Sequence, residues 1–285
     1  MATVSDRSVP VPRVALVTGA SSGIGRAVAL RLLADGWVVY GGARRPERMA
    51  DLIERGGRAL ALDVTDSASM EAALTVIDRE QHRLDALVNN AGVGVYGALE
   101  ELQIDQARRQ FEVNVFGLME LTQRVLPGMR ERGAGRIVNV GSMAGRIWMP
   151  VGGWYHASKY ALEALSDALR METRPFGIHV SLIQPGVIRS EWADIAQSNL
   201  AQGNDDSPYA SIKRQVSGVL RDRRFAGQPG QVADAVAKAL CARRPRRRYA
   251  VPLDAKLFIF LHWLFPTFVY EAVLKVVLAR YDRRR

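Results

Sequence analysis

The sequence TGASSGIG at residues 18–25 decides the fold, because it joins the apolar run Val14–Thr18 directly to an amphipathic segment. Glycine lets the backbone turn tightly and lets a pyrophosphate come close, and a helix that follows presents free N–H groups and the positive end of its dipole to that anion. The spacing is GxxxGxG, which differs from the G-x-G-x-x-G fingerprint. The stretch therefore predicts a nucleotide-binding turn, with a glycine-rich turn that only packs helix on strand as the alternative.

Outward from this turn, short β-branched apolar runs alternate with longer amphipathic segments. The alternation predicts βα units around a parallel sheet that is buried on both faces. Seven strands are predicted, at Val14–Thr18, Trp37–Gly41, Ala59–Val64, Ala86–Asn89, Arg136–Val140, His179–Ile183 and Arg248–Val251. Helices are predicted between them, for example at Gly25–Ala34 and at Ser67–Asp78, where Thr65 or Asp66 can act as the N-cap.

Composition excludes several classes of protein. A chain of 285 residues with 48% hydrophobic residues is not disordered. The single cysteine, Cys241, cannot form an internal disulfide, which fits a reducing cytoplasm. Residues 1–12 lack the apolar run of a secretory signal and are predicted to be a flexible tail. The four histidines form no i, i+4 pair and no cluster with cysteine, so we expect no metal site.

The net charge of +10 is confined to one end of the chain. Residues 221–285 hold 15 Lys and Arg against 5 Asp and Glu, so the first 220 residues are neutral. Neither a basic face with aromatic stacking positions nor a motif that reads nucleic acid appears, and no nucleic-acid partner is expected. The basic residues cluster at 243–248 and at the C-terminus, on either side of an apolar tail, so we interpret the charge as serving attachment or assembly.

Tyr155 and Lys159 are four residues apart at the start of a helical pattern, so both side chains leave the same helix face. An ammonium group close to a phenol favours the phenolate, so we expect Lys159 to lower the pKa of Tyr155. Ser142 closes the run RIVNVGS at the carboxyl end of a predicted strand, where open α/β sheets place their ligand crevice. The alternative is a packing tyrosine beside a lysine that points into solvent.

Several ordered motifs resemble the short-chain dehydrogenase/reductase family: TGASSGIG, Asn89-Asn90-Ala91-Gly92, Asn114, Ser142, Tyr155-His156-Ala157-Ser158-Lys159 and Pro185-Gly186. The resemblance covers about residues 12–251. It implies an α/β fold, a doubly wound Rossmann domain around a seven-stranded parallel sheet. We predict this domain at residues 13–253, with a substrate-covering insertion at 186–228, followed by an apolar and basic helical extension at 254–285.

The same resemblance implies roles in a hydride transfer to or from a nicotinamide. Tyr155 would donate or accept the proton on the substrate oxygen, and Ser142 would orient that oxygen. Lys159 would hold the nicotinamide ribose and tune Tyr155, while Asn114, near FEVNVFG in a long helix, would hold a water of the proton relay. His156 lies beside the tyrosine, but a helical neighbour points about 100° away, so we expect a structural role for it.

The second predicted strand ends in glycine where NAD-binding proteins carry a carboxylate, and Arg44 and Arg45 follow. A guanidinium can grip a 2′-phosphate with two hydrogen bonds, so NADP(H) is favoured over NAD(H), with an exposed arginine pair as the alternative. The resemblance assigns further cofactor contacts to Gly19, Ser21, Ser22, Gly23, Ile24, Gly25, Asp63, Val64, Asn89, Ala91, Gly92, Tyr155, Lys159, Pro185, Gly186, Val187, Ile188 and Ser190.

Apolar residues gather around the expected reacting carbon, and we predict that Gly94, Val95, Met143, Trp148, Met149, Trp154 and Trp192 line a substrate pocket. Such residues suit a roomy apolar pocket, although ordinary core packing is the alternative for about half of them. A hydrophobic ketone, aldehyde or secondary alcohol is the expected substrate. The insertion 186–228 would close over it and exclude water.

The tail Leu257–Ala279 approaches the length needed to span a bilayer, but His262, Pro266, Glu271 and Lys275 interrupt it. Two shorter helices divided near Pro266 fit better. They would lie on a membrane surface, pack over the protein's own cleft, or join subunits.

The sequence therefore predicts a cytoplasmic NADP(H)-dependent oxidoreductase that acts on a hydrophobic carbonyl compound and forms a homo-oligomer. Peripheral membrane contact through the tail is left open. The alternatives are an NAD(H)-linked alcohol or steroid dehydrogenase of the same fold, and a dinucleotide-binding regulator without catalysis.

Overall fold

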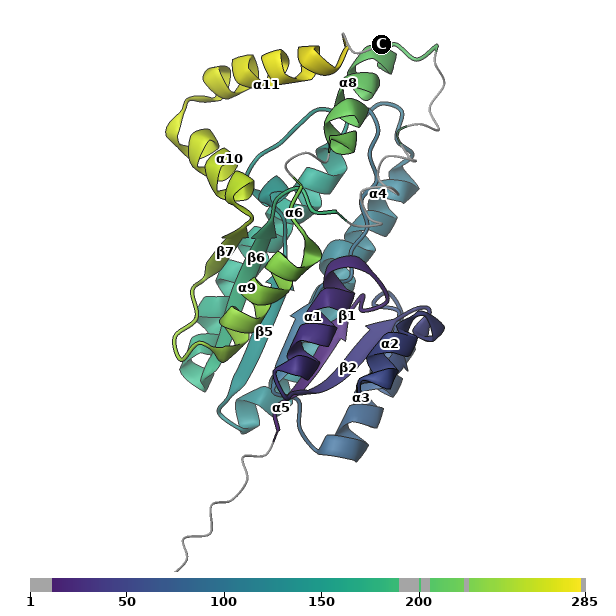
Figure 1. The fold of residues 1–285 in the computed structure, drawn as a ribbon, viewed down its shortest axis with the longest axis vertical. Coiled ribbons are helices and arrows are strands. Elements are labelled where there is room, and N and C mark those ends of the chain that lie inside the picture. The colour runs from purple at the N-terminus through teal and green to yellow at the C-terminus, as the bar shows by residue number, and fades with distance from the viewer. Residues whose placement is uncertain (1–11, 190–199, 201–205, 223–225, 283–285) are drawn as a thin grey trace, which may run out of the picture.

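A parallel sheet runs through the middle of the molecule in a computed structural model that describes residues 12–189, 200, 206–222 and 226–282 (Figure 1). Its seven strands follow the order β3-β2-β1-β4-β5-β6-β7, and every pairing is parallel. They are β1 (Val14–Thr18), β2 (Val38–Ala43), β3 (Arg58–Ala61), β4 (Ala86–Asn89), β5 (Gly135–Val140), β6 (Ile178–Pro185) and β7 (Arg248–Val251). The predicted fold class is confirmed, and the strand order reverses between β1 and β4, where such sheets bind ligands.

Helices cover both faces of this sheet. In chain order the helices are α1 (Gly23–Ala34), α2 (Ala50–Glu54), α3 (Ser67–Gln81), α4 (Ile104–Phe111), α5 (Leu118–Glu131), α6 (Gly153–Thr173), α8 (Ala210–Arg221), α9 (Pro229–Cys241), α10 (Leu253–Leu264) and α11 (Thr267–Asp282). Of these, α8, α10 and α11 lie beyond the carboxyl end of the sheet (Figure 1). Short helical turns lie at η1 (Pro46–Met49), η2 (Glu112–Gly117), η3 (Met143–Gly145) and η4 (Arg174–Phe176).

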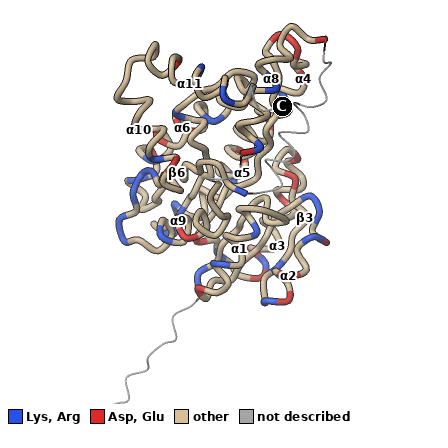
Figure 2. Tube along the Cα trace, turned by 45° about the horizontal axis from the view of Figure 1, so that its top comes forward, with Lys and Arg blue, Asp and Glu red and all other residues tan. Residues whose placement is uncertain are grey.

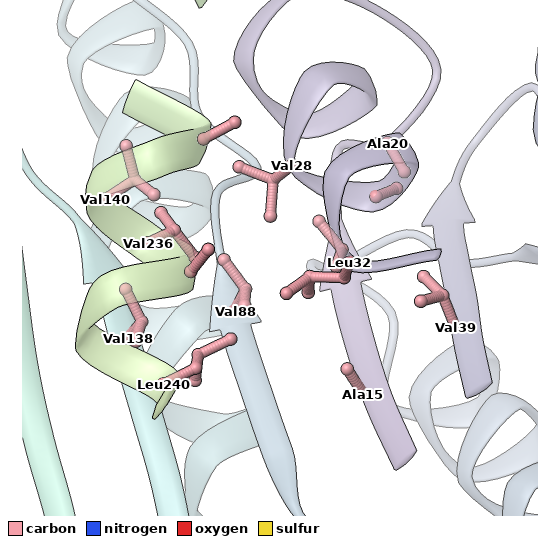
Figure 3. Close-up of a cluster of buried hydrophobic side chains, with 14 of the residues drawn as sticks. Ala15, Ala20, Val28, Leu32, Val39, Val88, Val138, Val140, Val236 and Leu240 are labelled. Carbon is pink, nitrogen blue, oxygen red and sulfur yellow. The ribbon is translucent and has the colours of Figure 1, made fainter. Parts of the chain in front are cut away.

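Side chains that alternate along the strands form two hydrophobic cores, one on each face of the sheet. On one face, Val28 and Leu32 of α1 and Val236 of α9 pack on Val88 of β4 (Figure 3). Its neighbour in β4, Leu87, points into the other core, with α3 and α5. Successive strand residues point to opposite faces, so a strand covered on both sides reads as a continuous apolar run.

Element boundaries differ from the predicted ones where side chains form turns. The third strand ends at Ala61 rather than Val64, because the Asp63 carboxylate accepts hydrogen bonds from Thr65 N and Oγ1 and turns the chain. Asp66 caps α3, accepting from Ala68 N, as predicted.

The C-terminal helices form a bent pair after β7. The first, α10, leaves the carboxyl end of the sheet, and α11 returns to lie along α8 (Figure 1). Gly218 of α8 permits this approach, since a Cβ there would lie 2.8 Å from Tyr281 Cβ. On its inner face, α11 therefore packs over the protein itself, which was one of the three alternatives. No helix among the described residues is both long enough and apolar enough to cross a membrane.

The basic run at 243–248 lies away from the apolar tail in space. It precedes β7, at the amino edge of the sheet, whereas α10 begins past the carboxyl end of that strand (Figure 2). Arg248 turns inward and pairs with Glu163 and Asp167. The run and the tail are neighbours in sequence, but β7 separates them in space, and Arg248 uses its charge in internal packing.

Candidate active site

The glycine turn is built so tightly that side chains cannot replace its glycines. Gly19 has a φ of +67°, and a Cβ on Gly25 would lie 2.2 Å from Gly19 O. Asn90 Nδ2 donates to Thr18 O at 2.9 Å, while Thr18 Oγ1 accepts from Asn90 N and Ala91 N. The segment after β4 is thereby bound to the turn after β1.

The turn leads into the N-terminus of α1, where an anion can be received. Ser22, the N-cap, is extended and makes no side-chain cap, so the first N–H groups of the helix are not covered by it. A cleft of about 480 Å³ opens there, lined by Ser21, Ser22, Gly23, Arg26, Glu47, Arg48, Ala50 and Asp51. Free N–H groups, the helix dipole and two arginines suit a phosphate, so the residues fit a dinucleotide.

Arg44 and Arg45 follow β2 and are exposed, and neither side chain forms a hydrogen bond or ion pair with another described residue, while the Arg45 main-chain carbonyl accepts from Arg48 N at 3.2 Å. Burial alone would raise the pKa of Asp63, but hydrogen bonds from Thr65 and the charges of Arg44 and Arg109 lower it. No sequence motif pointed to Arg109, which lies in α4 and acts on Asp63 through its charge. The structure thus brings Arg44 and Asp63 to one end of the crevice.

Ser142, Tyr155 and Lys159 meet at the carboxyl end of β5, and a Cβ on Gly92, which follows the neighbouring β4, would lie 3.8 Å from Lys159 Nζ. Ser142 caps η3, accepting from Ala144 N at 3.1 Å, and hydrogen-bonds Tyr155. Lys159 Nζ donates to Val140 O at 3.2 Å and lies 5.9 Å from the Tyr155 ring centre. Both α6 side chains are buried, so the alternative of a solvent-facing lysine is wrong.

Burial rather than charge sets the protonation of this cluster. It raises the pKa of Tyr155 to about 12, and the Ser142 hydrogen bond lowers it only in part. Burial also lowers the pKa of Lys159 to about 8. The expectation that Lys159 lowers the tyrosine pKa is wrong in this state, because the phenol sits among apolar groups and the ammonium is directed to Val140 O. Near pH 7 the phenol is protonated and the lysine charged.

Asn114 lies in a π-helical segment, η2, between α4 and α5. The sequence predicted a regular helix here, and π segments are rare and frequent at functional sites. Its Oδ1 accepts from Val93 N at 2.8 Å, and its Nδ2 donates to Val93 O and to Ser158 Oγ. The side chain therefore joins the loop after β4 to the helix that carries Tyr155.

Asn89 is a correction to the predicted cofactor contacts. Its side chain is buried in the sheet, where Nδ2 donates to Thr122 Oγ1 and Asn139 Oδ1, both at 2.9 Å. Val64 and Ile188 likewise pack into the two cores. The Asn89 side-chain amide is used inside the sheet, where Thr122 and Asn139 would otherwise lack a hydrogen-bond donor among apolar neighbours. Only the main chain of Asn89 therefore remains for a ligand.

The segment after β6 is fixed by the C-terminal extension. A Cβ on Gly186 would lie 2.6 Å from Asp254 Oδ2, and Val187 N donates to the same oxygen at 3.3 Å. Gly227 N also donates to Val187 O. Sequence reasoning missed Asp254, which lies nearly 70 residues further along the chain. Ser190 and Trp192 lie outside the described residues.

An apolar cluster surrounds Tyr155, and it differs from the predicted pocket. Tyr96, Ala144, Val151, Val216 and Leu278 pack with Tyr155, and Met149 and Leu274 border them. The Tyr96 and Tyr155 ring centres are 5.5 Å apart. Of the predicted lining, Met149 belongs here, Met143 begins η3, and Gly94 and Val95 lie in the loop after β4.

The two described tryptophans of the predicted pocket pack elsewhere. Trp154 packs edge-on against Phe111 of α4, and Trp148 against Tyr270 of α11. His156 Nδ1 lies 2.7 Å from Ile147 O and 3.0 Å from Ala144 O, which fits the structural role expected of it. Among the residues described, no group of three or more His, Cys, Asp and Glu could hold a metal ion.

A doubly wound parallel sheet with a glycine turn at its switch point, and a Ser–Tyr–Lys cluster at the same end of the sheet, defines a Rossmann-type oxidoreductase that uses a nicotinamide dinucleotide. The family model described as short chain dehydrogenase matches residues 13–200, and the chain belongs to the short-chain dehydrogenase/reductase family.

Relatives align over almost the whole chain. A 3-ketodihydrosphingosine reductase of Bacteroides thetaiotaomicron is 34% identical, covering 94% of this chain and 98% of its own. An NADPH-dependent 3-dehydrocapnine reductase of Ornithobacterium rhinotracheale is 35% identical, covering 89% and 93%. The crystal structure of a short-chain dehydrogenase from Streptomyces avermitilis superposes with a TM-score of 0.81 at 35% identity, covering 94% and 96%.

Proposed function

We propose that this protein is an NADPH-dependent reductase that converts a hydrophobic ketone or aldehyde into its alcohol. The observation that carries the proposal is the Ser142–Tyr155–Lys159 cluster, in which Tyr155 and Lys159 are buried and Tyr155 packs among apolar side chains, at the same end of the sheet as the glycine turn. When bound, the nicotinamide supplies the hydride. The protein's own residues then have to position the carbonyl and deliver a proton to its oxygen.

Tyr155 is the proton donor in this proposal. Its pKa of about 12 keeps the phenol protonated at neutral pH, which suits the direction of reduction. Ser142 orients the substrate oxygen through its hydroxyl. Lys159, with a pKa of about 8, is charged below that pH and stabilises the phenolate that forms as the proton leaves. Asn114 holds a relay water with its main chain or its remaining Oδ1 lone pair.

Cofactor preference is assigned to the end of β2. A Cβ on Gly41 would lie 2.6 Å from a Leu52 methyl group, and one on Gly42 would lie 2.5 Å from a Leu62 methyl group, so a side chain at either position would displace a leucine. Arg44, exposed directly after β2, supplies a guanidinium for the 2′-phosphate, with Arg45 second. The relative named as NADPH-dependent supports the same preference.

The substrate is assigned to a large apolar carbonyl compound. The cluster around Tyr155 draws side chains from α8 and α11, Val216 and Leu278 among them, which close it from above. Two relatives carry names that specify reduction of a 3-keto or 3-dehydro group, which agrees with a ketone.

The test is NADPH oxidation by purified protein over ketones and aldehydes graded in size and apolarity, with 3-ketodihydrosphingosine among them. We expect turnover with the larger apolar ketones. Tyr155→Phe should still bind NADPH but lose at least about 1000-fold in kcat, within the range that positioned proton transfer contributes. Substantial activity in this variant would refute the role of Tyr155, and NADPH binding without turnover of any carbonyl would favour the non-catalytic regulator.

A further inference from the structure

The corner between α10 and α11 exposes an apolar surface. We define the apolar corner as Phe260, Trp263, Leu264, Phe265 and Phe268. The Trp263 and Phe268 side chains are 77% and 72% exposed. No Asp, Glu, Lys or Arg occurs between residues 257 and 270. Soluble monomers rarely leave so continuous an apolar patch in water, so it marks a contact surface.

The protein covers only the inner side of these helices. Leu278 and Leu274 of α11 face the cluster around Tyr155, and the Tyr270 hydroxyl donates to Trp148 O. Ala255 of α10 is buried. The corner itself projects from the body of the molecule (Figure 1). A helix that is apolar all round must be covered on its outer side as well, and no described segment of this chain does so.

Cations frame the apolar corner on both helices. Lys256 precedes Pro266 by ten residues and Lys275 follows it by nine. At about 1.5 Å per residue, each stands roughly 14 Å from the corner along its own helix. Among the described side chains of α10 and α11, the exposed charges are Lys256, Lys275 and Arg280, whereas Asp254 and Glu271 are half-buried.

We propose that the apolar corner docks onto an anionic lipid bilayer. Its aromatic and aliphatic side chains enter the interface, and Lys256 and Lys275 lie at the level of the phosphates, where cations and aromatic residues anchor interfacial helices. A second copy would place the same cations against each other, whereas an anionic surface complements them. The docking is separate from the proposed reduction, because binding to lipid requires no turnover.

Docking would place the bilayer close to α11, which covers the cluster around Tyr155. Trp148 and Tyr270 contact each other between the corner and the cluster around Tyr155, with ring centres 5.4 Å apart. An apolar compound dissolved in lipid would then have a short path to the site.

The experiment is co-sedimentation of the full chain with vesicles of phosphatidylcholine and phosphatidylglycerol at a molar ratio of roughly 7:3. We expect the wild-type protein to sediment with the vesicles. A triple variant, Trp263→Ser, Phe265→Ser and Phe268→Ser, should lose at least about tenfold in vesicle partitioning. Lys256→Glu with Lys275→Glu should weaken binding to these vesicles but not to pure phosphatidylcholine.

A matched control replaces three exposed apolar residues on other surfaces, Ile53→Ser, Ile104→Ser and Met171→Ser. It should sediment like the wild type. Each variant is first checked for unchanged NADPH binding and thermal unfolding, so that a misfolded protein is not counted. The proposal fails if the wild type stays in the supernatant, if the control loses binding equally, or if the corner substitutions dissociate a dimer and leave vesicle binding unchanged.

Discussion

Lys159 is the residue whose protonation changes nearest to physiological pH. Its ammonium is buried and bonded to Val140 O, and burial places its pKa at about 8. The neighbouring Tyr155 stays protonated throughout the neutral range, with a pKa of about 12. Burial therefore raises the pKa of Tyr155 and lowers the pKa of Lys159, although both side chains leave the same helix face. Unperturbed lysine and tyrosine side chains both titrate near pH 10.

This pair predicts the pH dependence of reduction. Because the charged form of Lys159 is the active one and its pKa is lowered, kcat/KM should be constant up to about pH 7. It should then fall as pH rises through about 8, approaching tenfold per pH unit. Initial rates of NADPH oxidation across pH 6–10, corrected with Tyr155→Phe protein, measure it. A rate that climbs with pH over this range would mean that the phenolate is the working form.

Arg44 is the single residue that we expect to set the preference for NADPH over NADH. Arg44→Ala should weaken NADPH binding by about 10–100-fold, corresponding to about 1.5–3 kcal/mol for a charge-assisted hydrogen bond, and leave NADH binding unchanged. Fluorescence titration of both cofactors measures the two Kd values. Arg55→Ala, a change to another exposed arginine after α2, serves as the control. Equal weakening of NADPH and NADH binding would show that Arg44 does not contact the 2′-phosphate.

At the scale of elements, α6 is the part that holds the site together. Tyr155 and Lys159 lie in its first turns, and Glu163, one turn later, is buried. The Glu163 carboxylate accepts from Arg248 Nε of β7 at 2.8 Å and pairs with Arg146, which follows η3, at 3.1 Å. One side chain thus links the helix of Tyr155 to the loop after Ser142 and to the edge of the sheet.

Removing that link should be costly. Glu163→Ala leaves Arg248 without its buried partner, and we expect the free energy of unfolding to fall by about 3–5 kcal/mol. Asp167→Ala removes the second carboxylate that pairs with Arg248. Because the Asp167 side chain is 42% exposed, this change should lower the free energy of unfolding by at most about 1 kcal/mol. Urea unfolding of both variants measures the difference. Similar losses would show that Glu163 is not the anchor.

Over the whole molecule, the C-terminal extension belongs to the site although its sequence reads as an appendage. Asp254 holds the segment after β6, and α11 lies along α8 and contributes Leu278 to the cluster around Tyr155. The basic run at 243–248 ends up elsewhere, at the amino edge of the sheet (Figure 2), whereas Lys256, Lys275 and Arg280 stay on the two helices of the extension. Only part of the basic charge therefore lies on the same surface as the apolar tail.

Leu278 tests whether the extension is part of the domain. Leu278→Ala should lower the free energy of unfolding by about 2–5 kcal/mol, because the side chain is buried against the body of the protein. Val276→Ala, on the exposed side of the same helix, should change it by less than about 0.5 kcal/mol. Thermal or urea unfolding distinguishes the two. No loss with Leu278→Ala would leave α11 as a separate appendage.

The sequence by itself determined the order of the strands along the chain, the glycine turn and the Tyr155–Lys159 pair. These features depend on short-range spacing: one turn of helix, or one strand and the turn that follows it. Asp66 as a cap belongs to the same class. The site residues that could be predicted are those whose neighbours in sequence are also their neighbours in space.

Tertiary structure alone decided the rest. Several features arise between segments that are far apart in sequence. They are the directions of the pKa shifts, the inward turn of Asn89 and Arg248, the contact of Asp254 with Gly186, and the separation of the basic run from the apolar corner. Burial and desolvation depend on which side chains surround a group after the chain has folded, and no local pattern specifies that.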